Sequence, residues 1–215
     1  MNASKSENGF PGSEGVPDGV FHKAYRRKPA LWRTGRPQPA VLEALDRGWF
    51  SAETMLDAGC GSGENTIAIA KLRSEIRIVA RDLVPEAISL ARIKSRLAGV
   101  ESRIEFGVGD LRHGVSGPTF DEALDAGVLH LFSDADRLPY LRTIRDALRN
   151  GGWFTAIVFR DEETRPGGPR RMARDELEGL LTRSGFAVET IDKTVYETDA
   201  HEGGARSWLA RARAV

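Results

Sequence analysis

The chain has 215 residues, 40% of them hydrophobic, a length and composition that favour one domain with a sizeable core. Lys and Arg total 31, as do Asp and Glu, so the net charge is +0 and gives no electrostatic signature of nucleic-acid or anionic-membrane binding. No apolar run approaches the roughly 18 residues of a membrane-spanning helix. A single cysteine, Cys60, excludes an internal disulfide framework. We expect a cytoplasmic protein.

The N-terminal part of the chain is expected to precede the main folded core. Residues 1–18 are rich in Gly, Ser, Asn, Glu and Pro and lack the apolar segment of a signal peptide, so we interpret them as a disordered tail. Residues 21–30 are typical of a short helix or loop. Residues 39–50 predict a helix whose apolar face carries Val41, Leu42, Leu45 and Trp49.

From residue 51 onward, strand patterns alternate with helix patterns. The expected strands are 53–58, 76–81, 103–107, 120–126 and 153–159. The expected helices between them are 63–72, 85–98 and 134–149. This alternation predicts a doubly wound parallel sheet. It ends with a helix at 174–184 and two long strands, 186–196 and 205–213, which we expect to form an antiparallel hairpin at the sheet edge.

The loop between the first strand and its helix reads LDAGCGSGENT, residues 56–66. Its glycines are Gly59, Gly61 and Gly63. They let the backbone turn sharply and approach a ligand closely, and the helix start adds unpaired N–H groups. The spacing fits neither the G-x-G-x-x-G dinucleotide pattern nor a P-loop. The loop therefore predicts a site for another nucleotide-like cofactor, and Asp57 beside it suits one that carries an ammonium group.

Acidic residues also follow the second and third strands. Asp82 ends the apolar strand IRIVARD and is placed to accept hydrogen bonds from two ribose hydroxyls. Asp110 follows the third strand, where a carboxylate can accept a hydrogen bond from an adenine amino group. Together with Asp57, these residues put three acids at three successive strand tips, a pattern more specific than any one motif.

The motifs resemble, in order and spacing, those of class I S-adenosylmethionine-dependent methyltransferases. The matching segments are LDAGCGSG, DLVPEAI (82–88), GVGDL (107–111), FDEALDAGVLH (120–130) and LRNGGWFTAIVF (148–159). The resemblance covers about residues 50 to 160 and implies a Rossmann-like α/β fold. Its seven-stranded sheet would be mostly parallel, with the antiparallel hairpin at the C-terminus. Arg81 departs from the small residue usual in the family, and Asn150 from the usual proline.

The resemblance implies S-adenosyl-L-methionine as cofactor and no metal. The residues carried over as cofactor-binding are Trp32, Asp57, Gly59, Gly61, Gly63, Asp82, Leu83, Asp110, Leu111, Asp125 and Gly127. Residues 19–215 would then form a single methyltransferase domain, with a lid region at 19–50 and a core at 51–215.

The segment PALWRTGRPQP, residues 29–39, resembles one that precedes the core of small-molecule methyltransferases similar to thiopurine and thiol/halide methyltransferases. In that family its tryptophan packs over the cofactor, which implies the same for Trp32; Arg33 stands where the family often has Asp. Arg36 is a candidate to bind a substrate carboxylate. The alternatives are that Trp32 anchors the core and that Arg36 is a surface charge.

The fourth strand leads into DAGVLHLF, residues 125–132. It lacks the Asn/Asp-Pro-Pro-aromatic motif of methyltransferases that act on base amines or glutamine. His130 is expected near the point of methyl transfer, where an imidazole can take a proton from the acceptor; the alternative is that it packs beside the loop. Phe132, with Arg160 of the polar loop at 159–171, is a candidate for substrate binding.

These observations predict methyl transfer to a small-molecule acceptor through a sulfur, oxygen or nitrogen nucleophile by in-line displacement. A macromolecular (RNA or protein) methyltransferase and a non-catalytic S-adenosylmethionine-binding module are the alternatives. The neutral charge disfavours nucleic acid and membrane partners. We expect a monomer or a homodimer.

Overall fold

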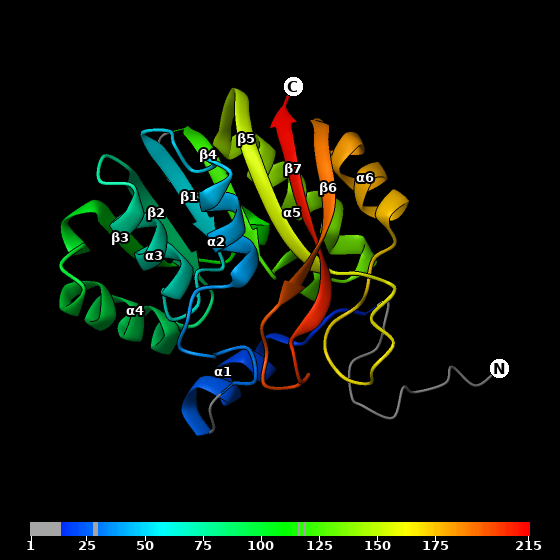
Figure 1. Ribbon diagram of the computed structural model, residues 1–215, viewed down its shortest axis with the longest axis horizontal. Coiled ribbons are helices and arrows are strands. Elements are labelled where there is room, and N and C mark those ends of the chain that lie inside the picture. Colours follow the sequence, from blue (N-terminus) through cyan, green and yellow to red (C-terminus); the bar gives the residue numbers. More distant parts are fainter. Residues whose placement is uncertain (1–13, 28–29, 116, 118) are drawn as a thin grey trace.

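A computed structural model describes residues 14–27, 30–115, 117 and 119–215. The helices are α1 (Asp18–Arg27), α2 (Pro39–Asp46), α3 (Glu64–Leu72), α4 (Pro85–Leu97), α5 (Asp134–Ala147) and α6 (Arg174–Arg183) (Figure 1). The strands are β1 (Thr54–Ala58), β2 (Arg77–Asp82), β3 (Ile104–Val108), β4 (Phe120–Ala126), β5 (Leu148–Phe159), β6 (Phe186–Tyr196) and β7 (Ala205–Ala214).

The strands form one seven-stranded sheet in the order β3-β2-β1-β4-β5-β7-β6. The first five strands pair in parallel, whereas β7 runs antiparallel to both β5 and β6. The predicted Rossmann-like sheet with its C-terminal hairpin is therefore confirmed. The strand order reverses between β1 and β4, and in such sheets ligands bind beyond the carboxyl ends of the strands at this switch point.

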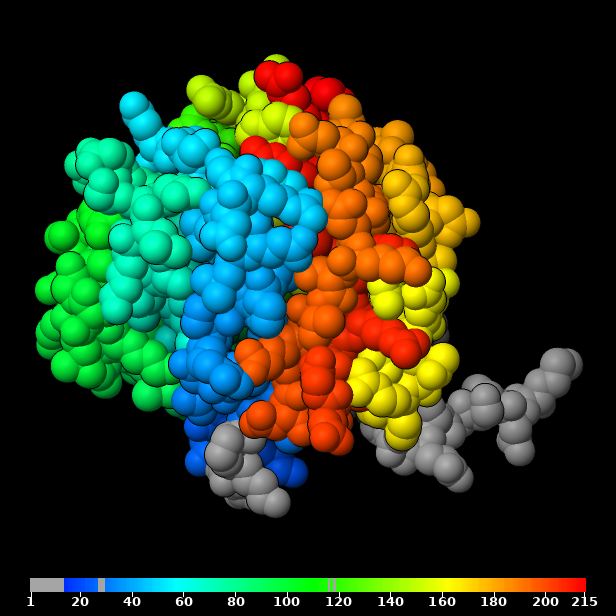
Figure 2. Space-filling model, in the orientation of Figure 1, coloured from blue at the N-terminus to red at the C-terminus, as the bar shows by residue number. Residues whose placement is uncertain are grey.

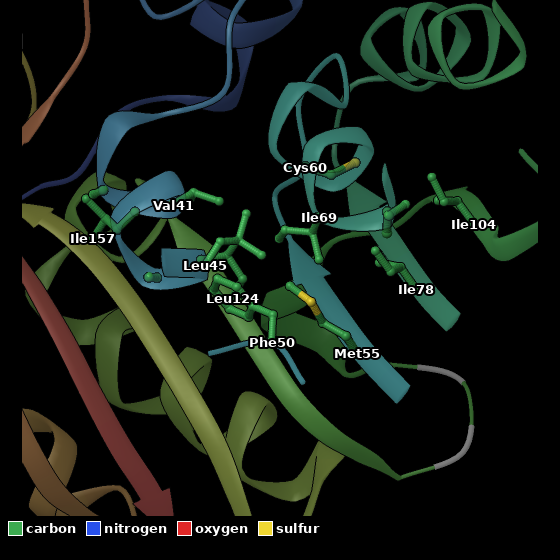
Figure 3. Packing of buried hydrophobic residues seen from close by; sticks show 14 of the residues in the cluster. Val41, Leu45, Phe50, Met55, Cys60, Ile69, Ile78, Ile104, Leu124 and Ile157 are labelled. Atoms are coloured by element: carbon green, nitrogen blue, oxygen red, sulfur yellow. The ribbon is translucent and has the colours of Figure 1, made fainter. Parts of the chain in front are cut away.

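Helices cover both faces of the sheet, as the alternating apolar pattern requires. One buried cluster joins α2, α3 and α4 to the sheet through side chains such as Val41, Ile69 and Ile88. Figure 3 shows part of this cluster, with Leu45 and Phe50 near Leu124 of β4. On the opposite face, Tyr140 and Leu177 belong to the cluster that packs α5 and α6. In the described part of the chain, none of the helices has the length and apolarity to cross a membrane.

Several element boundaries differ from the expected ones, and two helix ends show the physical reason. The helix expected to reach residue 149 ends at Ala147, and Leu148 already pairs with Phe120 as the first residue of β5. The helix expected to reach residue 50 ends at Asp46, because Gly48 and Phe50 take positive φ angles of 79° and 57°. In both places, pairing or turn geometry overrides a helical pattern of apolar residues.

Three segments gather at the carboxyl edge of the parallel strands, at the bottom of Figure 1: the N-terminal segment with α1, the loop after β5 and the turn between β6 and β7. Figure 2 shows the blue N-terminal segment against the orange turn. The backbone N–H of Asp199 in that turn donates to the carbonyl of Leu31 over 2.8 Å. Residues 1–13 of the predicted tail lie outside the described residues, whereas Val16 donates to the carbonyl of Leu131 over 2.7 Å.

Candidate functional site

A cavity of about 570 Å³ lies at this carboxyl edge. Its floor is the glycine loop, the ends of β2 and β3 and the segment after β4. Its cover comes from residues within 14–25, 31–38, 168–169 and 196–201. The volume is in the range of small-molecule sites, which run from roughly 300 to 1,000 Å³.

The glycine loop is shaped by left-handed backbone conformations. Gly59 and Gly61 have φ angles of 77° and 55°, which L-residues with side chains rarely adopt. A Cβ atom on Gly59 would stand 2.1 Å from Val128 Cγ2, and one on Gly61 would stand 3.1 Å from the hydroxyl of Tyr25. The loop therefore needs glycine both for its turn and for the close approach of neighbouring segments.

Asp82 lies at the end of β2 and lines the cavity. Its carboxylate accepts hydrogen bonds from the backbone N–H groups of Gly61 (2.8 Å) and Val84 (2.9 Å), which fix its position. Burial raises the pKa of this carboxyl above its usual value, and the two N–H donors oppose that change. Since each oxygen of a carboxylate has two lone pairs, Asp82 keeps the capacity to accept from ligand hydroxyls.

Asp110 also lines the cavity, but a neighbouring arginine holds it. Arg112 donates to the two carboxylate oxygens over 2.9 Å and 2.7 Å, and the hydrogen bonds from Arg112 lower the pKa of Asp110. The same guanidinium forms an ion pair of 2.7 Å with Asp18 of α1. The end of β3 is thus tied to the segment that covers the cavity.

The acids Asp57 and Asp125 do not line the cavity, in contrast to Asp82 and Asp110. Asp57 is 1% exposed and accepts from the Thr66 hydroxyl over 2.5 Å, and burial raises its pKa to about 7. Asp125 is 0% exposed. It accepts from the N–H groups of residues 127, 128 and 129 and from the Tyr140 hydroxyl.

Direct cofactor contact by Asp125 stays a prediction, which this geometry does not favour because the chain itself supplies four donors to the carboxylate. Its burial raises its pKa to about 6. The residue holds the backbone of Gly127 and Val128, which do line the cavity. Gly63 also lies outside the cavity lining, at the start of α3, where a Cβ atom would stand 3.0 Å from that of Ala91.

Aromatic residues of the N-terminal segment cover the glycine loop. Trp32 packs edge-on against Phe21 and Tyr25, with ring centroids 5.9 Å and 6.5 Å apart, and all three line the cavity. The Tyr25 hydroxyl is buried and has no hydrogen-bond partner among the described residues. The Arg33 guanidinium lies over the Tyr25 ring at 4.9 Å, and its Nε is likewise buried without such a partner.

Sequence reasoning missed Tyr25. The spacing of four residues between Phe21 and Tyr25 puts both rings on one helix face, which was the available signal.

The lining of the cavity fits the expected cofactor. The described residues offer a carboxylate for ribose at Asp82, a glycine cradle, and two unpartnered donors suited to the carboxylate of a methionine group.

His130 is buried at the cavity wall, where its Nδ1 accepts a hydrogen bond of 3.0 Å from the backbone N–H of Phe159. A neutral imidazole that accepts at Nδ1 carries its proton at Nε2, so neither nitrogen has a free lone pair. Burial, with a smaller contribution from Arg137, lowers the pKa of His130 to about 3. The geometry therefore does not support His130 as a proton acceptor, and it favours the alternative of a packed residue beside the loop.

The candidate substrate residues occupy different surroundings. Phe132 lines the cavity and packs on Tyr140 at 4.7 Å between ring centroids. Arg36 lines the cavity, is largely exposed and forms an ion pair with Glu197. Arg160 does not line the cavity; its guanidinium lies 5.6 Å from the Trp208 ring and 3.3 Å from Glu162. Direct substrate contact by Arg160 stays a prediction that the cavity lining does not support. Leu83 and Leu111, two of the expected cofactor-binding residues, follow the ends of strands and line the cavity.

A second aromatic wall was not anticipated from the sequence. It consists of Phe159, Tyr196 and His201 beside His130, all of which line the cavity. Ring centroids of Phe159 lie 5.0 Å from His130, 5.7 Å from Tyr196 and 6.0 Å from His201. These residues come from β5, β6 and the turn after β6. The sequence pattern of residues 186–213 indicated only a hairpin at the edge of the sheet.

Comparisons with known proteins agree with this geometry. A family model described as "Methyltransferase domain" matches residues 50–200. Probable thiol methyltransferase 2 of Arabidopsis thaliana is 22% identical over 175 residues, which are 81% of this chain and 76% of the plant protein. A ribosomal protein L11 methyltransferase of Bacillus cereus (strain Q1) is 35% identical over 152 residues, or 70% of this chain, and the chain spans only 43% of that relative.

The solved structure of the N-methyltransferase NodS from Bradyrhizobium japonicum WM9, in complex with S-adenosyl-L-homocysteine, is similar with a TM-score of 0.70. The identity is 20%, and the likeness covers 90% of this chain and 98% of that one, so it bears on the fold. The family model matches more than half of the chain, and the strand ends and glycine loop of that part line the cavity. The chain therefore belongs to the methyltransferase domain family and is an S-adenosylmethionine-dependent methyltransferase.

Proposed function

We propose that this methyltransferase acts on a small molecule that carries a sulfur, oxygen or nitrogen nucleophile on a largely apolar body. The observation that supports this proposal best is the cover of the cavity. The N-terminal segment and the turn after β6 meet over it, through the bond from Asp199 N–H to Leu31 and a 3.0 Å bond from the Thr198 hydroxyl to the same carbonyl. An acceptor must therefore be small enough to fit beneath this cover, or the cover must open before the acceptor can bind.

The cofactor-binding residues divide between two ends of the cavity. We assign the ribose hydroxyls to Asp82 and the adenine amino group to Asp110, as the strand-end pattern predicts. The methionine group would lie along the glycine loop, with its carboxylate facing the unpartnered donors of Tyr25 and Arg33. Trp32 packs behind Tyr25 and closes this end of the site.

When bound, S-adenosylmethionine supplies a methyl group already activated by its sulfonium. The residues of the chain then have two tasks, which are to align the acceptor with that methyl group and to exclude water. Alignment falls to the aromatic wall of Phe159 and Tyr196 and to Phe132. Exclusion of water falls to α1, which is held by the Asp18–Arg112 ion pair and by a second one of 2.6 Å between Arg26 and Glu86.

A macromolecular acceptor is the rival class, and the L11 methyltransferase relative represents it. The covered cavity disfavours this class, because a side chain or base on a large polymer would have to pass the Leu31–Asp199 contact. A non-catalytic cofactor-binding module is disfavoured by the aromatic wall, which extends the cavity beyond the residues assigned to the cofactor.

The test is methyl transfer from labelled S-adenosylmethionine to a panel of purified acceptors. Small phenols, thiols and N-heterocycles form one arm, and ribosomal protein L11 and RNA form the other. We expect label in at least one small molecule and none in the polymers, with loss of transfer in Asp82→Ala. Transfer to L11 or RNA alone would overturn the small-molecule proposal, and no transfer in either arm would leave the binding module as the better account.

A further inference from the structure

His130 and His201 line the cavity, and they differ in which ring nitrogen forms a hydrogen bond. His130 accepts at Nδ1 from the Phe159 N–H, so its only lone pair is occupied. His201 places Nε2 at 3.1 Å from the carbonyl oxygen of Pro166. A carbonyl oxygen can only accept, so Nε2 of His201 carries the proton and Nδ1 carries the lone pair.

The Nδ1 atom of His201 is buried, and it has no hydrogen-bond partner among the described residues. The residue as a whole is 4% exposed. Buried polar atoms in folded proteins almost always have a partner, and an exception calls for a reason such as a catalytic role or a bound ligand. His201 lines the cavity, and an unpaired basic nitrogen on a cavity-lining residue can act as a general base when substrate arrives.

Neighbouring loops fix the position of this ring. The turn that carries it is closed by bonds from His201 N–H to Thr198 and from Gly204 N–H to His201, of 3.3 Å and 2.8 Å. On the other side, a Cβ atom on Gly168 would stand 2.8 Å from the Phe159 ring and 3.6 Å from Cε1 of His201. Gly168, at φ 86°, thus lets the loop after β5 pack against both rings.

The charged groups around this turn are already balanced. Arg165 donates to the carbonyls of Glu202 and Gly204 over 2.8 Å and 2.6 Å, and its charge is paired with Glu163 at 2.6 Å. The turn itself carries the carboxylates of Asp199 and Glu202, and His130 lies on the other side of Phe159. The ion pair holds the turn in place, and the imidazole of His201 takes no part in it.

We propose that His201 is the catalytic general base of this enzyme and takes the acceptor proton at Nδ1, directly or through one water molecule. The acceptor atom bonds to the methyl carbon with its lone pair, and the carbon–sulfur bond breaks with its electrons kept by sulfur. The acceptor proton passes to Nδ1, and the imidazolium later releases it to solvent. This inference rests on the proposed small-molecule function and deepens it.

A base of this kind selects an acceptor class. Halides, and sulfur acceptors already present as thiolates, attack without losing a proton, so they gain nothing from an imidazole beside them. A hydroxyl or a ring N–H must lose its proton as the methyl bond forms. With the aromatic wall of Phe159 and Tyr196 around it, His201 points to an apolar or aromatic acceptor whose nucleophilic atom is an O–H or a ring N–H.

The test compares His201→Gln with Glu202→Gln. The amide nitrogen of Gln can replace Nε2 as donor to Pro166, so H201Q keeps the turn but removes the base, whereas E202Q changes the charge of the same turn and leaves the base. On an O–H or N–H acceptor turned over by the wild type, we expect kcat to fall about 10²- to 10⁴-fold in H201Q and to stay unchanged in E202Q.

Two readouts besides turnover keep the result interpretable. S-adenosylhomocysteine should bind H201Q and wild type equally in calorimetry, which shows an intact donor site. In nitrogen-15 spectra of the wild type, His201 Nδ1 should appear as an unprotonated, non-bonded nitrogen. Wild-type turnover with unchanged kcat in H201Q, or a proton found on Nδ1, would overturn the base assignment alone. Failure of the wild type on every small acceptor would instead overturn the proposed function.

Discussion

The hydroxyl of Tyr25 lies 3.1 Å from the position that a Cβ atom on Gly61 would take, so α1 rests directly on the glycine loop. The hydroxyl has no hydrogen-bond partner among the described residues, and burial raises its pKa above the usual value. A neutral phenol in this position is a donor without an acceptor, next to the part of the site assigned to the methionine carboxylate.

Tyr25→Phe should therefore weaken cofactor binding without unfolding the protein. A hydrogen bond to a charged group contributes about 1.5–3 kcal/mol, which corresponds to a loss of roughly 10- to 100-fold in affinity. The measurement is calorimetric titration with S-adenosylhomocysteine, and the control is the melting temperature of the free protein, which should not fall. Wild-type affinity in Y25F would show that the hydroxyl does not touch the cofactor.

Arg33 and Tyr25 should act on the same ligand group. Arg33→Met keeps the length of the side chain but removes its donors, and we expect a loss of affinity similar in direction to that of Y25F. Because one carboxylate would face both side chains, the double variant should lose less than the sum of the single losses. Strictly additive losses would mean that the two residues contact separate parts of the ligand.

Asp82→Ala should reduce S-adenosylhomocysteine affinity by at least about tenfold, since it removes acceptors for the ribose and also the anchor of the Gly61 and Val84 N–H groups. Asp82→Asn keeps one acceptor oxygen and should fall between Ala and the wild type. Glu53→Ala, at an exposed position before β1, is the matched control and should bind normally. Equal affinity for D82A and the control would remove Asp82 from the cofactor site.

His130 should matter chiefly for stability. His130→Ala leaves the buried N–H of Phe159 without a partner, at a cost of about 1–3 kcal/mol in the free energy of unfolding. In His130→Asn the amide oxygen can replace Nδ1 as acceptor, so most of that stability should return. Denaturant unfolding of the two variants checks this expectation. A large loss of kcat in a stable H130N variant would restore His130 as a candidate base.

Asp57 should make the protein less stable as the pH rises from about 4 to about 7. Burial raises its folded-state pKa to about 7 from the usual 3.8, so in this window the folded protein holds a proton that the unfolded chain has released. Stability falls wherever the folded state binds more protons. Asp57→Asn cannot titrate, so the difference in melting temperature between wild type and D57N should change across this window. A constant difference would contradict the raised pKa.

The fold and the donor site could be predicted because they depend on local patterns. Asp82 and Asp110 follow the neighbouring apolar strands β2 and β3, and parallel strands end at one edge of the sheet, so both residues line the cavity there. The same reasoning finds less support for Asp125, which lies near the end of β4. Its carboxylate turns to the N–H groups of the next loop and to Tyr140 of α5, and no pattern in the sequence distinguishes this from a ligand contact.

The acceptor side could not be predicted, because its residues are far apart in the sequence. Phe159 and Tyr196 meet only when β7 is inserted between β5 and β6, and the turn after β6 brings His201 to them. Which ring nitrogen carries the proton in His130 and in His201 depends on one backbone group each, the N–H of Phe159 and the carbonyl of Pro166. A sequence shows that His130 is near the loop after β4, but not which of its nitrogens is occupied.

The most direct test of methyl transfer to a small molecule follows a labelled methyl group in a cell extract. The extract is first heated to inactivate its own methyltransferases, and after the reaction it is separated by size. With labelled S-adenosylmethionine and the wild-type enzyme, we expect label in the small-molecule fraction, and none there with D82A. Label confined to the protein or RNA fraction would contradict this expectation.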